Sequence, residues 1–164
     1  MLHEVPVPAG TAGRPAVEAD LDAIRDLLTR RWRDVLPDVD NEVMRHLVDR
    51  REARRRGADI VRFIGARTEE GDVASWADLY VDPATGTAQI KDLITSKAHL
   101  RGGYADAVLT TVLRMAADED CSIRFLTADA SDWPRQWYER RGFSIIGHST
   151  ASNAVEGKAA VSCR

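Results

Sequence analysis

The chain has 164 residues, of which 44% are hydrophobic and 30% are charged, and its formal net charge is −3. That length is enough for one domain with its own hydrophobic core, and the composition excludes a wholly disordered chain. The small negative net charge disfavours a general nucleic-acid binder, because such proteins carry an excess of positive charge.

The cysteines and the N-terminal residues predict an intracellular protein without a metal. Cys121 and Cys163 form no CxxC pair, and the four histidines show no metal-ligand spacing. Residues 1–10 lack the features of a secretory signal, and no stretch approaches the roughly 20 apolar residues that cross a bilayer. We therefore expect one domain over residues 1–164, in the cytoplasm, with no metal and no membrane partner.

The first third of the chain predicts two helices. Residues 6–15 contain three prolines and two glycines, which favour an irregular segment. Apolar residues at helical spacing then predict a helix over residues 17–32 and another that begins near Val43 and continues into an arginine-rich run. Six arginines lie between positions 45 and 56. They could bind phosphate, but the interleaved Asp49 and Glu52 favour a solvated helix face.

The rest of the chain predicts an α/β (α+β) fold. Strands are expected at 59–66, 73–81 and 87–95, and the turn signals between them favour an antiparallel meander. A helix with a clean apolar stripe follows Gly103, and a strand at 122–128 implies a parallel, right-handed crossover. A short helix from Pro134 to Arg140 and a strand at 143–146 complete the pattern. These elements predict a mixed central sheet with helices on both faces.

The junction before the striped helix carries the clearest chemical signal. Residues 95–109 read T-S-K-A-H-L-R-G-G-Y-A-D-A-V-L. Two glycines allow backbone N–H groups to converge at a helix start, where a phosphate or pyrophosphate can bind. The loop lacks the Gly-Lys-Ser/Thr end of a Walker A loop and the third glycine of a dinucleotide fingerprint. Taken alone, Gly-Gly before a helix also fits a plain turn.

Two motifs in order resemble the GNAT superfamily of N-acetyltransferases, in particular a bacterial branch. The family's signature Gln/Arg-x-x-Gly-x-Gly/Ala is matched at Gly103 and Ala105, whereas Leu100 replaces its first residue. Trp137-Tyr138-Glu-Arg-Arg-Gly142-Phe143 resembles the family's Tyr-x-x-x-Gly-Phe element, and residues 129–134 resemble the preceding loop of the bacterial branch. The resemblance covers roughly residues 60–147.

The resemblance implies that the acyl donor is acetyl-CoA and assigns residues to it. Its pantetheine would lie along the 89–95 strand, which splays from its neighbour in this family. A backbone N–H near Leu93 or Ile94 would polarise the acyl carbonyl, and Tyr138 would protonate the leaving thiolate. The implied cofactor-binding residues are Leu93, Ile94, Thr95, Leu100, Arg101, Gly102, Gly103, Tyr104 and Ala105.

The general base is the weakest part of the resemblance. One branch of the family carries a glutamate eleven positions before the signature, and here that position is Gln89. An amide cannot accept a proton at useful pH. Asp92, predicted on the other face of the same strand, and Asp78, on the neighbouring strand, are candidates that would act through water. Each also fits an ordinary carboxylate on the strand surface.

The resemblance implies transfer of an acetyl group from acetyl-CoA to an amine by direct attack in a ternary complex. The alternative is a non-catalytic acyl-CoA-binding or interaction module on the same fold, favoured by Gln89 and Leu100. The acceptor would be a small-molecule amine or a peptide amine, and its identity does not follow from the sequence. A homodimer stays open.

Overall fold

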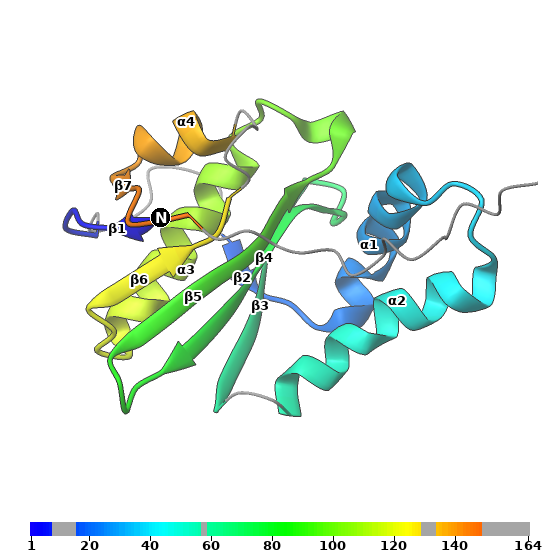
Figure 1. Ribbon diagram of the computed structural model, residues 1–164. Coiled ribbons are helices and arrows are strands. Elements are labelled where there is room, and N and C mark those ends of the chain that lie inside the picture. The colour runs from blue at the N-terminus through cyan, green and yellow to red at the C-terminus, as the bar shows by residue number, and fades with distance from the viewer. Residues whose placement is uncertain (8–15, 57–58, 129–133, 149–164) are drawn as a thin grey trace, which may run out of the picture.

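The computed structural model describes residues 1–7, 16–56, 59–128 and 134–148. In these ranges the chain forms one seven-stranded mixed sheet, in the order β2-β3-β4-β5-β6-β1-β7, with helices on both faces (Figure 1). This confirms the predicted fold class. The elements are β1 (Leu2–His3), β2 (Ala16–Glu18), α1 (Leu21–Val35), α2 (Asn41–Ala53), η1 (Arg54–Arg56), β3 (Ile60–Arg67), β4 (Val73–Asp82), β5 (Thr87–Thr95), η2 (Lys97–His99), α3 (Tyr104–Asp118), β6 (Ile123–Leu126), α4 (Pro134–Glu139) and β7 (Phe143–Ser144).

The predicted meander and crossover are both present. β3, β4 and β5 pair in succession as antiparallel strands. The chain then returns through α3 to β6, which lies parallel to β5. This connection places the start of α3 at the end of β5, where the glycine loop lies.

The N-terminal third differs from its prediction at two places. Val17 lies in β2, where it is exposed, and α1 begins only at Leu21. The helix starts there because the Asp20 carboxylate caps it, accepting a hydrogen bond from the Ala23 N–H at 2.8 Å. Residues 2–3 form β1, which lies between β6 and β7. A strand of two residues is too short to show a periodicity, so the sequence did not predict it. Most of the segment 6–15 lies outside the described residues.

Two hydrophobic clusters cover the two faces of the sheet. α3 packs its apolar stripe on one face, against side chains such as Leu79 and Ile90. α1 and α2 cover the other face, where Trp76 and Phe63 are fully buried. In the described part of the chain, no helix combines the length and apolar character of a membrane span.

Candidate active site

A β-bulge turns Asp92 toward the helix α2. Two residues of β5, Asp92 and Leu93, lie opposite the single residue Ala77 of β4, and Asp92 has a φ of 51°. In an unbroken strand Asp92 would share the α3 face with Ile90. The extra residue re-aims it, as bulges do, and the carboxylate reaches arginines of α2 and η1. The prediction that Asp92 faces away from Gln89 was therefore wrong, because strand alternation is interrupted between them.

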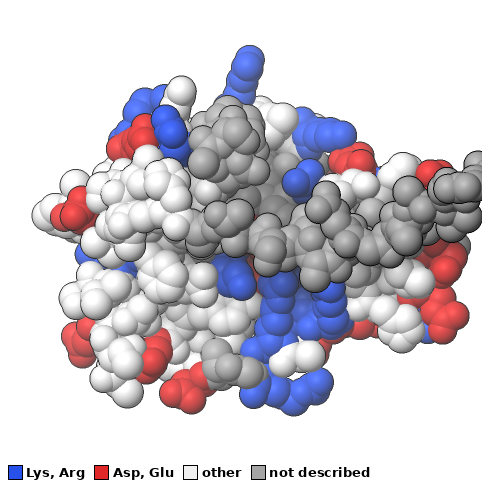
Figure 2. All heavy atoms as spheres, in the orientation of Figure 1, with Lys and Arg blue, Asp and Glu red and all other residues white. Residues whose placement is uncertain are grey.

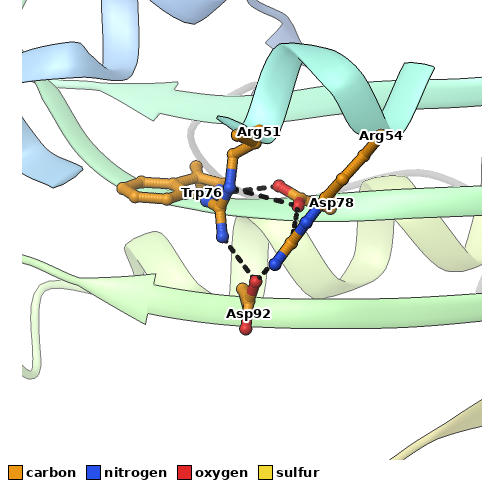
Figure 3. A network of polar contacts seen from close by, with 5 residues as sticks. All are labelled: Arg51, Arg54, Trp76, Asp78 and Asp92. Carbon is orange, nitrogen blue, oxygen red and sulfur yellow. Dashed lines mark hydrogen bonds and ion pairs between the residues drawn. The ribbon is translucent and has the colours of Figure 1, made fainter. Parts of the chain in front are cut away.

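Two arginines hold two aspartates in one network (Figure 3). Arg54 Nη1 donates to Asp78 Oδ2 at 3.1 Å and to Asp92 Oδ2 at 2.9 Å. Arg51 lies with its Nε 3.5 Å from Asp78 Oδ2, and its Nη2 donates to Asp92 Oδ2. Trp76 Nε1 donates to the other oxygen of Asp78 at 3.2 Å, and its ring lies under the Arg51 guanidinium.

The pKa values of the two carboxyl groups are shifted in opposite directions. Burial raises the pKa of Asp78 above its usual value and outweighs the attraction of Arg51 and Arg54. Burial alone would also raise the pKa of Asp92, but the hydrogen bond from Arg54 and the charges of both arginines lower it below its usual value. Asp92 therefore stays ionised at neutral pH.

This network corrects two expectations from the sequence. Asp78 is completely buried, so it is no strand-surface carboxylate. Arg51 is only 6% exposed, so the arginine run is not simply a solvated face. The signal was present in the helix period, because Arg51 follows the buried residues Met44 and Val48 by seven and three positions. The bulge that completes the network has no comparable signal in the sequence.

A cleft of about 540 Å³ lies beside the network. It brings together the bulge of β5, the end of β6 and the helices α1, α2 and α4. The predicted residues Asp92, Leu93, Ile94 and Tyr138 all line it. Arg31 was assigned to no site and Arg50 was expected on a solvated face, yet both line the cleft together with Trp32. Other lining residues are Leu28, Val35, Leu47, Arg51, Arg54, Ile90, Leu126, Thr127, Ala128 and Pro134.

Tyr138 lies on α4 with its ring packed in the core. Its ring makes edge-to-face contacts with Trp137 and Phe143, at centroid distances of 5.1 and 5.6 Å. Burial raises the pKa of the Tyr138 phenol to about 12. The hydroxyl group is thus protonated at neutral pH, and it belongs to a residue that lines the cleft.

β5 and β6 pair over only part of their length. The parallel register joins Thr87–Ile90 to Ile123–Leu126, and β5 continues beyond it through Lys91 to Thr95. The second half of β5 therefore has hydrogen-bonded pairs with β4 but none with β6. β6 ends at Leu126, its last paired residue, so Leu93 and Ile94 lie in a part of β5 beyond the end of β6, and the splay stays a prediction.

The glycine loop lies at the start of α3, and it is not part of the cleft lining. Gly103 is the residue before the helix, with a φ of 79°, and Arg101 has a φ of 63°. A Cβ at Gly102 would come within 2.8 Å of the Tyr104 ring, whereas a Cβ at Gly103 would meet nothing within 4 Å. The N-cap residue Gly103 offers no side-chain hydrogen bond to the 15-residue helix α3, and a helix start is a common site for an anion.

Comparison with known proteins identifies a family and supports the fold. A family model described as the acetyltransferase (GNAT) family matches residues 21–143. The sequence matches none of the curated proteins with which it was compared. Similar solved structures include a putative acetyl transferase from Pyrococcus furiosus, with a TM-score of 0.64 and 14% identity over 82% of this chain and 97% of that one.

Two further structures have the same fold. Glucosamine-6-phosphate N-acetyltransferase from Arabidopsis thaliana has a TM-score of 0.63 and 15% identity, over 85% of this chain and 97% of its own. The PaiA N-acetyltransferase from Thermoplasma acidophilum, in complex with coenzyme A, has a TM-score of 0.63 and 10% identity, over 84% and 93%. The match of the family model covers most of the chain, and the fold agrees with it. The chain therefore belongs to the acetyltransferase (GNAT) family.

Proposed function

We propose that the protein transfers an acetyl group from acetyl-CoA to an amine by direct attack within a ternary complex, as a member of a bacterial branch of the family. The observation that carries this proposal is one cleft in which Tyr138 meets the half of β5 that has no pairs with β6. The half-strand would supply backbone groups for the acyl donor, and Tyr138 would supply a proton. We also propose that the protein works in the cytoplasm, which rests on its cysteine content.

The residues of the glycine loop fit the diphosphate of acetyl-CoA, which supplies the reactive thioester when bound. The loop from Leu100 to Ala105 has the open space at Gly103 that a close phosphate needs. The first turn of α3 supplies N–H groups and the positive end of the helix dipole. Leu93, Ile94 and Thr95 offer a strand edge to the pantetheine amides, in the manner of an added strand.

Tyr138 is proposed as the general acid. In the transfer, the amine nitrogen forms a bond to the thioester carbon, the carbon–sulfur bond breaks, and the nitrogen loses a proton. The thiolate takes a proton from the Tyr138 hydroxyl, which the buried ring keeps protonated. A backbone N–H of Leu93 or Ile94 is proposed to stabilise the oxyanion that forms in between.

Asp92 is proposed as the catalytic residue that receives the amine. Its pKa is lowered by Arg54 and Arg51, so it is a weak base but a permanent negative charge at the cleft. The Asp92 carboxylate can bind the ammonium form of the acceptor, and the ammonium proton then passes to water. Asp78 is buried behind it and does not line the cleft, so we assign it no direct role.

The second candidate is a non-catalytic acyl-CoA-binding module. It is favoured by Gln89, which occupies the position of the glutamate in one branch and cannot accept a proton. The experiment that separates the two is a screen of amines with acetyl-CoA, followed by mass measurement of the products. An acetylated amine supports the enzyme, and acetyl-CoA binding without any product supports the module.

A further inference from the structure

The wall of the cleft carries an excess of arginine. Among the described residues, four arginines line it, namely Arg31, Arg50, Arg51 and Arg54, and Asp92 is the single acidic one. Arg51 and Arg54 are paired with Asp78 and Asp92. Within the described ranges, Arg31 and Arg50 form no ion pair, so their charges face the cleft without an acidic counterpart.

Two of these side chains are restrained by their surroundings. The Arg50 guanidinium lies 5.5 Å from the ring centroid of Trp32, which also lines the cleft, and this contact restricts a long side chain. Arg51 is almost completely buried, and its Nη1 has no hydrogen-bond partner in the described part of the chain. An unpaired buried donor on a charged group is costly unless something bonds to it.

The surface agrees with this local picture. Figure 2 shows Lys and Arg side chains gathered over the C-terminal part of α2, beside the sheet. The chain as a whole has a net charge of −3, so this concentration of positive charge is not a general property of the chain. Arginine is suited to carboxylate and phosphate groups because its planar fork can donate two parallel hydrogen bonds.

We infer that the acceptor amine also carries a carboxylate or phosphate group, which Arg31 and Arg50 bind while Asp92 holds the amine. This inference rests on the proposed function and names the class of its acceptor. The cleft volume of about 540 Å³ lies within the range of small-molecule sites, so a compact zwitterionic amine fits. The arginines come from α1 and α2, whereas the anion site of the glycine loop is at the start of α3.

The test uses pairs of amines that differ in one anionic group. γ-Aminobutyrate is compared with butylamine, and phosphoethanolamine with ethanolamine, by calorimetric titration of the 164-residue protein with and without CoA. We expect the anionic member of at least one pair to bind about tenfold more tightly, which corresponds to about 1.4 kcal/mol. The carboxylate and phosphate pairs show which anion the site takes.

Variants then locate the site. In Arg31→Ala/Arg50→Ala the preference for the anionic amine should vanish, while acetyl-CoA affinity stays unchanged. Arg45→Ala is the matched control, because Arg45 is exposed on α2, lies outside the cleft lining and should leave the preference intact. Equal affinity for both members of each pair, absence of binding, or a loss confined to acetyl-CoA would overturn the inference. Anion binding that depends on the arginines without any acetyl transfer would overturn the proposed function alone.

Discussion

At the scale of single residues, Tyr138 gives the most direct test of the proposed chemistry. Tyr138→Phe removes one hydroxyl group and keeps the packed ring, so the fold should change little. We expect kcat to fall about 100-fold, the usual effect of a positioned acid, with acetyl-CoA affinity close to wild type. Steady-state kinetics and calorimetry on one preparation check both values. An unchanged kcat in Tyr138→Phe would leave this residue with a packing role only.

The shifted pKa of Tyr138 predicts how the rate depends on pH. A tyrosine in water loses its proton near pH 10, whereas burial raises the pKa of Tyr138 to about 12. Because the raised pKa keeps the acid protonated, kcat should rise as the amine deprotonates and should not fall near pH 10. Ultraviolet titration of the phenol groups provides an independent measurement. A decline near pH 10 that disappears in Tyr138→Phe would show that the burial does not hold in solution.

Arg51 is predicted to matter for stability. Arg51→Ala leaves the completely buried Asp78 with less compensation, and the loss of one partner of a buried pair costs about 3–5 kcal/mol. Arg45→Ala, on the exposed face of the same helix, should change stability by less than about 0.5 kcal/mol. Denaturant unfolding of both variants measures this difference. If Arg51→Ala lowers the free energy of unfolding no more than the control does, Asp78 is neutral in the folded protein and its burial needs no charged partner.

The residue scale is also where the sequence was least informative. The helical period places Arg51 on the buried face of α2, but its charge favoured a solvated face. Asp92 could not be placed from alternation, because the bulge before Leu93 reverses its direction. A bulge depends on how two strands pair, and that pairing is not local to either strand. Leu93, Ile94 and Tyr138, which the family resemblance named, all line the cleft.

At the scale of elements, the loop before α3 can be tested by charge. Gly103→Asp places a carboxylate where the diphosphate is proposed to bind, and the new Cβ would meet no atom within 4 Å beyond its neighbours along the chain. We expect acetyl-CoA binding to be lost while the protein stays folded, because like charges repel in the same site. Isothermal titration and circular dichroism measure the two properties.

A second glycine provides the control for that substitution. Gly71 also has a positive φ, a Cβ added to it would meet nothing within 4 Å, and it lies in the turn between β3 and β4. Gly71→Asp should carry a similar conformational cost and leave acetyl-CoA binding intact. Wild-type affinity in Gly103→Asp would show that the diphosphate binds elsewhere.

The elements that were predicted well are long and strongly patterned. The strand 87–95 was predicted with its observed bounds, and the helix after Gly103 has the expected apolar stripe. The predicted start of the first helix was too early, because Val17 matches the helical period by chance. The Asp20 cap sets the actual start at Leu21. β1 has only two residues, and its place between β6 and β7 follows from tertiary pairing alone.

At the scale of the whole molecule, ligand binding should stabilise the fold selectively. Acetyl-CoA at 100 times its Kd should add about 2.7 kcal/mol to the free energy of unfolding. ATP and NAD should add much less, because the loop lacks the residues that their common motifs use. Thermal unfolding with each ligand at one concentration measures the order. Equal or greater stabilisation by ATP would contradict the assignment of the donor.

The most direct test of the central claim is the amine-dependent release of free CoA thiol from acetyl-CoA, followed over a panel of amines that includes the anionic pairs. The proposed function predicts thiol release that requires both the amine and the protein, matched by an equal amount of acetylated amine, and strongly reduced in Tyr138→Phe. Tight binding of acetyl-CoA with no amine-dependent thiol release across the panel would contradict it and identify the chain as a binding module.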